Sequence, residues 1–446
     1  MNNGDFMRLH GNLSRRQFLI TAGASTLTSL ALHGCANNQT AGSTTATTPN
    51  AQGGSNTSVK LGFLPVVDSA PLIIAKEKGF FTKHGAKNVE VAKQASWSAL
   101  RDNIEIGSAG GGIDGGHFQS PIPELISEGK ITKRNQKIPM YILARMNTHG
   151  VGISVVNQYQ KLGVNLDSSP LRNIFAQAKS KGNKIKCAIT FPSSSIDLWL
   201  RYWLAAGGIN AEEDASIFVI PPSQVVSSMK QGTMDIFCAT DPWNARIVNQ
   251  KIGFTAVTSG EIWKNHPEKV FTMRADWVDK NPELVKAVLA GIMEAQQWCD
   301  KSENKDELCR ILAEKNYVNA PISDIEGRIK GKFDYGDGRV VENPSLAIKF
   351  WSSEGTSISF PFKSHDTWFL TENIRWGKIS ANTDVKKIVN TCNREDLWRE
   401  VAKSLGVADA DIPKTSSRGI ETFFDGIKFD PDNPQAYLQS LKIKKV

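Results

Sequence analysis

The sequence has few cysteines and no long hydrophobic run. Of 446 residues, 6 are Cys, and none stands at the CxxC or Cys/His spacing that is typical of zinc sites and dithiol redox motifs. No stretch reaches the roughly 18 consecutive apolar residues that a membrane-spanning helix needs, so a multi-pass membrane protein is excluded. With 40% hydrophobic and 22% charged residues, the composition also excludes collagen, a coiled coil and a fully disordered chain.

Recognised catalytic motifs are missing as well. The sequence has no GxSxG elbow, HExxH helix, EF-hand loop or Cys-His signature, and it has no nucleic-acid-binding motif. The formal net charge is +8, from 53 Lys+Arg against 45 Asp+Glu, and the charges are spread along the chain. A basic balance without a nucleic-acid motif favours small anions as ligands.

The N-terminal residues predict export and a lipid anchor. SRRQFL at 14–19 resembles a twin-arginine signal, and the apolar stretch 18–32 has the length of a signal-peptide core. LHGC at 32–35 resembles a lipobox, although His33 stands where a small residue is usual. We therefore expect removal of residues 1–34 and diacylation of Cys35; the alternative is a plain signal peptide that happens to contain a Cys. The segment 35–58 has no charged or aromatic side chain, which predicts a lipid anchor followed by a disordered linker.

Beyond residue 58, strand-like and helical segments alternate. Short apolar runs predict strands at 59–67, 89–92, 139–144, 186–190, 218–220 and 235–238. Amphipathic patterns predict helices at 195–206, 223–231 and 282–300, and near 367–377 and 394–405 in an otherwise irregular tail. Strand–helix alternation predicts an α/β fold with mostly parallel sheets. In such folds ligands bind beyond the carboxyl ends of the strands.

Several loops that follow predicted strands carry residues suited to an anion, and each also has a structural explanation. The Gly-rich segment 107–117 suits an anion cradle or a structural turn. The Ser-rich segment 190–197 precedes a helix and suits an anion site or a plain N-cap. The Gly-bracketed segment 147–152 suits a hinge or an ordinary loop. Trp97 suits a pocket wall or a core position, and the spacing around Lys269 by itself favours a solvated surface charge.

The cysteines beyond Cys35 leave two alternatives open. Cys299 and Cys309 stand at a spacing at which they could pair in an oxidising compartment. The other alternative is that all five are small core residues: Cys187, Cys238, Cys299, Cys309 and Cys392.

Short segments along the chain resemble the cyanobacterial-type nitrate- and bicarbonate-binding lipoproteins of ABC importers. They are ASW at 95–97, GGIDG at 111–115, LARMNT at 143–148, DPWNAR at 241–246, HPEK at 266–269 and GIETFFDG at 419–426. The resemblance covers nearly all of 59–446. It implies a periplasmic-binding-protein fold with a ligand cleft between two α/β lobes. It also implies delivery of the ligand to a permease driven by ATPase subunits, at the periplasmic side of the cytoplasmic membrane. We further expect that the protein is not an enzyme and has no cofactor or metal.

The resemblance allows the lobes to be placed on the sequence. We predict lobe 2 at 149–262 and lobe 1 at 59–148 and 263–446, with the C-terminal tail wrapping lobe 1. The chain then crosses between lobes near 148–150 and 259–260, where Gly residues suit a hinge.

The resemblance also implies which residues line the ligand pocket. Trp97 and Lys269 match the nitrate binders at their pocket positions, Thr190 fits the nitrate and the bicarbonate binders alike, and we count Gly150 among the ligand-binding residues as well. Two further pocket positions depart from that pattern, because Val151 stands where the nitrate binders carry Gln and Ile196 stands where they carry His.

These residues narrow the ligand to a small monovalent anion. Lys269 supplies one positive charge, whereas the resemblance implies an acidic residue at this position and an assisting calcium ion in the bicarbonate binders. Nitrate would lose two donors at Val151 and Ile196, at about 1–3 kcal/mol each, whereas linear cyanate tolerates apolar flanks. We expect nitrate or nitrite first because of the family, with cyanate and then bicarbonate as alternatives.

Two functions outside the importer class also remain open. One is an anion sensor. The other is a small-anion enzyme, whose general base would be His117, His149 or Asp114.

Overall fold

The computed structural model describes residues 57–445. The predicted export signal, Cys35 and nearly all of the linker lie outside the described residues. In the part of the chain that the structure describes, every helix is too short or too polar to cross a lipid bilayer.

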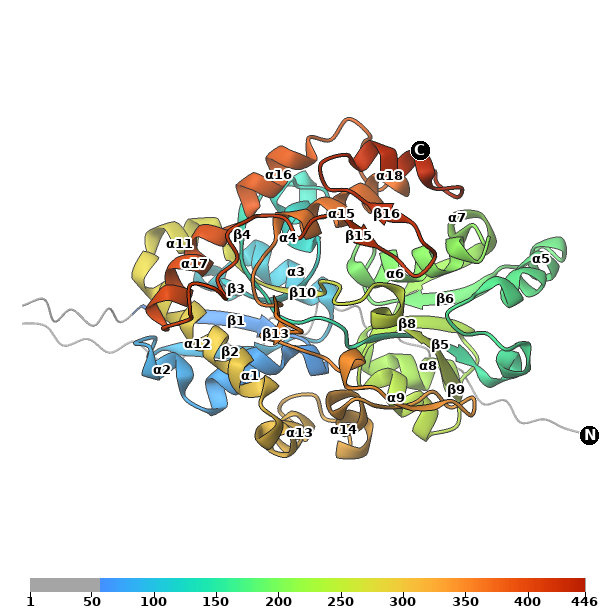
Figure 1. Cartoon of the computed structure of the whole chain (residues 1–446), viewed down its shortest axis with the longest axis horizontal. Helices are drawn as coiled ribbons and strands as arrows, with labels where there is room; N and C mark the ends of the chain where they lie inside the picture. Colours follow the sequence, from blue (N-terminus) through green and yellow to red (C-terminus); the bar gives the residue numbers. More distant parts are fainter. Residues whose placement is uncertain (1–56, 446) are drawn as a thin grey trace, which may run out of the picture. The chain divides into compact units, whose positions relative to one another are not determined.

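Two five-stranded sheets form the frame of the described chain (Figure 1). The first sheet has the order β2-β1-β3-β10-β4 and contains β1 (Val59–Phe63), β2 (Val89–Lys93), β3 (Gly115–Gln119), β4 (Met140–Arg145) and β10 (Lys269–Arg274). The second sheet has the order β7-β6-β8-β5-β9 and contains β5 (Val151–Val156), β6 (Ile185–Ile189), β7 (Ala215–Val219), β8 (Ile236–Thr240) and β9 (Gly253–Thr258). Below, lobe 1 and lobe 2 denote the first and second sheet with the helices packed on them.

The α/β class is confirmed, but the sheets are mixed instead of mostly parallel. In the first sheet β1 runs parallel to β2 and β3, whereas β10 runs antiparallel to β3 and β4. In the second sheet β6 runs parallel to β7 and β8, whereas β5 runs antiparallel to β8 and β9. The reason is that β5 and β10 each follow a crossing from the other sheet. Each therefore begins beside the carboxyl end of a parallel strand and runs antiparallel to that strand.

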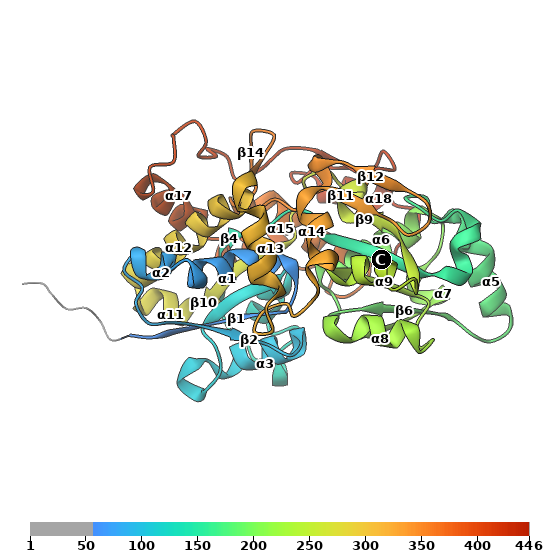
Figure 2. The same ribbon diagram turned by 90° about the horizontal axis from the view of Figure 1, so that it is seen from below.

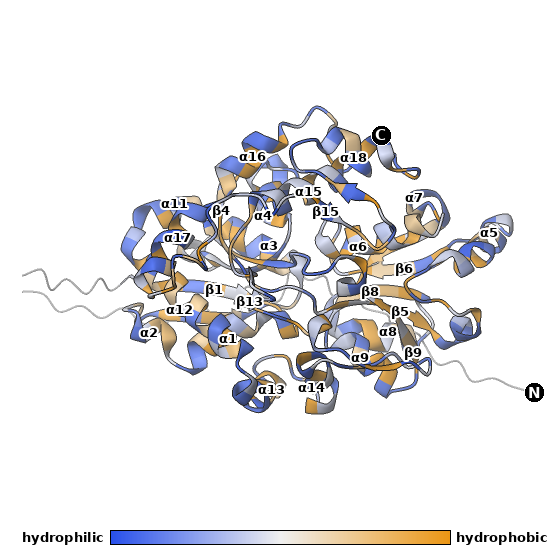
Figure 3. Ribbon diagram, viewed as in Figure 1, coloured by the Kyte–Doolittle hydropathy of each residue, from blue (hydrophilic) through white to orange (hydrophobic). Residues whose placement is uncertain are grey.

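The helices cover both faces of each sheet (Figure 2). On one face of the first sheet, the buried residues of β1 pack with α1 (Ala70–Glu77) and α12 (Pro282–Asp300). On the other face lie α3 (Trp97–Ile106) and α4 (Ile122–Ser127). The second sheet is flanked by α6 (Ser195–Ala206), α8 (Val225–Lys230) and α9 (Trp243–Asn249). Hydrophobic residues line the central strands and hydrophilic residues the outer helices, as Figure 3 shows.

The predicted helices at 195–206 and 282–300 are confirmed as α6 and α12. The helix predicted at 223–231 is shorter, because a 3-10 turn at Pro222–Gln224 precedes α8. In the tail, α15 (Lys363–Arg375) and α17 (Glu395–Ser404) lie close to the predicted positions. The tail packs on both lobes, since α17 contacts α12 and the Tyr202 hydroxyl of α6 donates to Asp425 Oδ1 at 3.0 Å.

The remaining elements are small or peripheral. The other helices are α2 (Phe80–Lys83), α5 (Arg172–Ser180), α7 (Ala211–Asp214), α10 (Ser259–Ile262), α11 (Ala275–Lys280), α13 (Lys305–Ala313), α14 (Ile322–Lys330), α16 (Val385–Cys392) and α18 (Pro434–Ser440). Three two-stranded hairpins pair β11 (Lys332–Asp334) with β12 (Val340–Glu342), β13 (Ser352–Ser353) with β14 (Thr356–Ser357), and β15 (Glu421–Thr422) with β16 (Lys428–Phe429).

The five described cysteines are buried free thiols. Cys299 and Cys309 lie in the core that joins the first sheet to α12 and α13. Of the two alternatives, the disulfide is therefore wrong, and the small core residues are confirmed.

Candidate functional site

A cluster of buried charged side chains joins the two sheets. Lys269, the first residue of β10, is fully buried. Its Nζ lies 2.9 Å from Oδ2 of Asp68 and 2.8 Å from Oε1 of Glu268. It also donates a hydrogen bond of 3.2 Å to Oγ1 of Thr240, the last residue of β8 in the second sheet. One ammonium group of lobe 1 thus reaches the end of a lobe 2 strand.

The charges in this cluster hold one another in the ionised state. Burial by itself lowers the pKa of Lys269, but the Asp68 and Glu268 carboxylates raise it above its ordinary value. Burial opposes ionisation of Asp68 too, yet Lys269 and His117 lower its pKa. His117 Nε2 lies 2.8 Å from Asp68 Oδ1, and burial lowers the pKa of His117. A neutral His117 therefore donates to Asp68, and the formal charge of the cluster is that of two carboxylates and one ammonium.

Glu268 has neutral donors of its own from lobe 2. Its Oε1 accepts a hydrogen bond of 2.5 Å from the Ser195 hydroxyl. Its Oε2 accepts one of 2.7 Å from Nε1 of Trp199, also on α6. Neither carboxylate of the cluster depends on Lys269 alone for a partner, because Asp68 has His117.

Three of the predicted pocket residues lie close to this cluster. Lys269 is one of its members. The Trp97 ring centroid lies 6.0 Å from the Lys269 Nζ, within range of a cation–π contact. Thr190 directly follows β6, and its Oγ1 accepts a hydrogen bond of 2.9 Å from Nε2 of Gln119, which pairs with Lys269 in the register of β3 and β10.

The other three predicted residues lie in lobe 2 and at the crossing into it. Val151 pairs with Thr240 in the register of β5 and β8, and Ile196 directly follows Ser195 in α6; both side chains are buried. Gly150 has a φ of +82°, where a Cβ would lie 2.9 Å from Cδ1 of Ile348, so the backbone requires glycine here. The structure therefore gathers all six predicted residues around the contact of the two sheets. As ligand contacts they remain predictions.

Two predicted anion loops have structural roles instead. In the Gly-rich segment, Gly115 and Gly116 belong to β3, and a Cβ at Gly116 would come within 2.1 Å of the Gly62 carbonyl oxygen. In the Ser-rich segment, the backbone N–H of Ser195 donates to the Ser120 carbonyl at 2.7 Å, and that of Ser193 donates to Asp197 Oδ2 at 2.8 Å. The structural explanation therefore fits the Gly-rich segment. In the Ser-rich segment these two N–H groups have protein acceptors, but Ser194 at the N-cap position of α6 makes no side-chain capping hydrogen bond, and its hydroxyl donates to the Phe191 carbonyl at 2.7 Å.

The candidate catalytic bases do not form one site. His117 is bonded to Asp68, and Asp114 accepts from the backbone N–H of Lys60 at 3.0 Å. His149 lies at the crossing between the sheets, where Nε2 accepts a hydrogen bond of 2.9 Å from the backbone N–H of Asn265. Each of the three is therefore held by a different set of partners.

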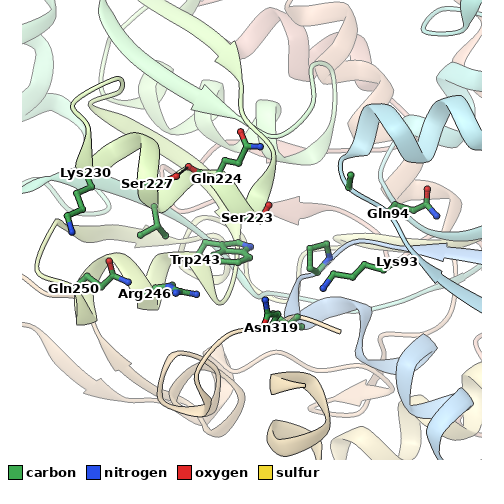
Figure 4. A pocket seen from close by; sticks show the side chains of 14 residues that line it. Lys93, Gln94, Ser223, Gln224, Ser227, Lys230, Trp243, Arg246, Gln250 and Asn319 are labelled. Carbon is green, nitrogen blue, oxygen red and sulfur yellow. Dashed lines mark hydrogen bonds between the residues drawn. The ribbon is translucent and has the colours of Figure 1, made fainter. Parts of the chain in front are cut away.

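A cavity of about 830 Å³ lies between the two lobes. Lobe 1 contributes Lys93 and Gln94 at the end of β2, and lobe 2 contributes Lys230, Trp243 and Arg246 (Figure 4). The cavity is close to the Lys269 cluster along the chain, since Gln94 precedes Trp97 and Trp243 follows Thr240. We call the two regions the inner cluster (Asp68, His117, Thr240, Glu268 and Lys269) and the outer cavity.

Comparison with known proteins identifies the family. Residues 52–313 match the model of the NMT1-like family. The chain is 52% identical over 450 residues to a nitrate/nitrite binding protein of Nostoc, covering 98% of this chain and 100% of that one. It is 46% identical to a bicarbonate-binding protein of Synechococcus elongatus, covering 97% of this chain and 98% of that one. The chain belongs to this family of nitrate/nitrite- and bicarbonate-binding proteins. The resemblance inferred from the sequence is thereby confirmed.

The same family relationship extends to a solved structure and to an ATP-binding protein. The periplasmic nitrate-binding protein of Synechocystis superposes with a TM-score of 0.83 at 52% identity, covering 86% of this chain and 98% of that chain. The periplasmic-binding-protein fold expected for the chain is therefore confirmed. A nitrate import ATP-binding protein of Synechocystis is 31% identical over 385 residues, which are 86% of this chain and 55% of that protein.

Sequence reasoning missed most partners of Lys269 and the whole outer cavity. Glu268 and Trp243 entered the sequence analysis only as members of segments that carry the family resemblance. A usable signal was present, because Gln119 and Thr240 are polar residues at the carboxyl ends of buried strands, where ligands bind in α/β sheets.

Proposed function

We propose that this protein is the extracytoplasmic solute-binding lipoprotein of an ABC importer, and that it captures a small monovalent anion, with nitrate or nitrite first. The observation that carries the proposal is the position of Lys269, a buried ammonium group beside Trp97 at the contact of the two sheets. Membership in a family with nitrate/nitrite-binding relatives supports the choice of anion. The related ATP-binding protein supports delivery to a permease and its ATPase subunits.

The inner cluster can exchange a protein contact for an anion contact. An ammonium group has three N–H donors, which here face Asp68, Glu268 and Thr240. If one of these donors turns to a ligand, Asp68 keeps its contact with His117, and Glu268 keeps those with Ser195 and Trp199. The two carboxylates outnumber the one ammonium group, so the cluster repels a doubly charged anion more strongly than a singly charged one.

Cyanate is the second candidate, because Val151 and Ile196 are buried apolar side chains, 1% and 0% exposed. A flat nitrate ion has acceptors all around its edge, and an acceptor that faces an apolar side chain in a dry site stays unpaired. A linear anion has acceptors at its two ends only. Bicarbonate ranks third, since the resemblance implies that bicarbonate binders carry an acidic residue at the position of Lys269.

The ligand can be established by calorimetric and thermal-shift titration of the full-length protein with nitrate, nitrite, cyanate, and bicarbonate with and without calcium. A ligand at about 100 times its Kd should add about 2.7 kcal/mol to the free energy of unfolding. We expect nitrate or nitrite to bind and Lys269→Ala to abolish binding. Thr190→Val is a milder second variant, in case Lys269→Ala does not fold. Val151→Gln should strengthen nitrate binding relative to cyanate.

Three outcomes contradict parts of this proposal. A folded Lys269→Ala variant with the affinity of the wild type would exclude the inner cluster as the site. A response to cyanate alone would give Val151 and Ile196 a selective role. A response to bicarbonate only with calcium would reverse the assignment made from Lys269.

The anchor and the absence of catalysis belong to the same proposal. We infer that Cys35 carries lipid and holds the protein at the periplasmic side of the cytoplasmic membrane. Replacing Cys35 with Ser should release the protein from the membrane fraction.

We also infer that the protein is not an enzyme, so the pure protein should return every bound anion unchanged. Turnover of an anion would favour the enzyme alternative. A sensor would bind the anion equally well but would not support its uptake by cells.

A further inference from the structure

The outer cavity has an unbalanced charge. Its lining includes the cationic side chains of Lys93, Lys230 and Arg246, and the 14 lining residues include no carboxylate. Arg246 Nε lies 3.8 Å from Oδ2 of Asp324, which is not among the lining residues. The Lys93 ammonium donates to the Lys315 carbonyl, which is neutral. The cavity therefore presents positive charge to whatever enters it.

The cavity also contains a buried donor without a partner. Trp243 is 4% exposed, and its indole Nε1 is a buried atom with no hydrogen-bond partner among the described residues. A buried N–H without an acceptor costs free energy. In Figure 4 the indole lies across the cavity, between Arg246 and Lys93, with its nitrogen end toward the side of Lys93. A ligand with an acceptor oxygen would satisfy this donor.

We propose that the outer cavity is a second anion site, in which a small oxyanion accepts a hydrogen bond from Trp243 Nε1 and lies between the cations Arg246 and Lys93. This inference rests on the proposed function only for the identity of the anion. The cavity of about 830 Å³ is far larger than a nitrate ion, so the anion is held with water around it. From there the anion passes to the inner cluster, which is buried and in which Asp68 and Glu268 pair with Lys269.

The two sites should differ in what they contribute. Exposed cations that face a cleft raise the local anion concentration and the association rate, and added salt screens this effect. A buried, paired ammonium provides selectivity instead, because the anion must lose its water there. The outer site is therefore expected to be the weaker and less selective of the two.

The test is a calorimetric titration of the full-length protein with nitrate, in a buffer whose only other anion is gluconate. We expect the wild type to bind two nitrate ions, and Trp243→Phe to weaken the outer site by about tenfold or more, as expected for one hydrogen bond to a charged group. Trp243→Phe breaks no existing hydrogen bond, so it should fold. Trp277→Phe, on α11 outside the cavity, is the matched control.

A second variant tests the charges. Lys93→Gln/Arg246→Gln should lower the rate of nitrate association at low salt by about tenfold, and the difference should vanish at high salt. Lys137→Gln/Lys179→Gln removes the same charge from exposed side chains, 65% and 51% exposed, that do not line the cavity. This control should bind like the wild type.

The outcomes separate the two proposals. One nitrate per chain in the wild type, or wild-type affinities in Trp243→Phe, would overturn the outer site and leave the inner one intact. Failure of the wild type to bind nitrate, nitrite or cyanate at any site would overturn the proposed function itself. Equal association rates for the two double variants would exclude electrostatic capture by Lys93 and Arg246.

Discussion

The inner cluster and the outer cavity each contain cationic side chains, but only the inner cluster pairs its cation with carboxylates. In the inner cluster a fully buried ammonium meets two carboxylates within 3 Å, and each carboxylate has further donors. In the outer cavity three partly exposed cations line the space without a carboxylate. The reason is burial, because a buried charge must be paired to be tolerated, whereas water solvates an exposed one. The protein consequently balances the cation of the inner cluster with its own carboxylates, whereas no carboxylate lines the outer cavity beside its cations.

Two buried indoles, one bonded to the inner cluster and one in the outer cavity, differ in one hydrogen bond. Trp199 donates from Nε1 to Glu268 at 2.7 Å, and Trp243 Nε1 has no partner among the described residues. The same side chain thus completes a network in one region and offers a free donor in the other. The two regions can therefore be compared by making the same substitution, such as Trp to Phe, in each of them.

The largest effect is expected at Lys269. Replacing it with Met leaves Asp68 and Glu268 buried without their cation, which should lower the free energy of unfolding by about 3–5 kcal/mol. Lys93→Met, which removes the same charge from the outer cavity, should change it by less than about 0.5 kcal/mol. Urea denaturation of both variants measures the difference. Similar losses of unfolding free energy in the two variants would mean that the paired cation Lys269 and the cavity cation Lys93 do not differ in their contribution to stability.

Acid should destabilise the crossing between the lobes next. His149 and His266 stack with their ring centroids 5.5 Å apart. Burial, joined for His149 by the charge of His266, lowers the pKa of each to about 3. An unfolded histidine binds a proton near pH 6.5, so between pH 6.5 and 3 the unfolded chain binds more protons. The stability that each histidine contributes is complete above pH 6.5 and falls by about 1.4 kcal/mol per pH unit below it.

Denaturation between pH 7 and pH 4 measures this effect. His149→Gln should have a shallower pH dependence than the wild type. Lys93→Gln/Arg246→Gln should keep the wild-type slope, since lysine and arginine stay charged throughout this range. A slope that changed in the second variant instead would place the acid-sensitive groups in the outer cavity.

The smallest effect separates the two indoles. Trp199→Phe removes a hydrogen bond to a buried carboxylate and should cost about 1–3 kcal/mol of unfolding free energy. Trp243→Phe removes no bond and should change stability by less than about 0.5 kcal/mol in the absence of anion. With saturating nitrate the wild type should gain stability over Trp243→Phe. Equal stabilisation of the two proteins by nitrate would mean that the anion does not reach the Trp243 indole.

Much of the local structure could be predicted from the sequence. Helical periodicity predicted α6 at 195–206 and α12 at 282–300, because the spacing of apolar residues along a helix can be recognised within the segment itself. The motifs around Trp97 and HPEK identified the family. The predicted pocket residues lie around one contact between the sheets; among them Thr190 directly follows β6, whereas Val151 begins β5 and Lys269 begins β10.

What the tertiary structure decided is which groups meet. The sequence did not reveal that β5 and β10 run against their neighbours, that Asp68 and Glu268 neutralise Lys269, or that Lys93 and Arg246 share a cavity with an unpaired Trp243. These residues lie far apart along the chain, and local pattern carries no information on their distances. The sequence by itself therefore determined the elements, the family and the residue types at the strand ends. Folding determined which charges are paired and buried and which remain free to act on a ligand, because pairing depends on distance and on exclusion of water.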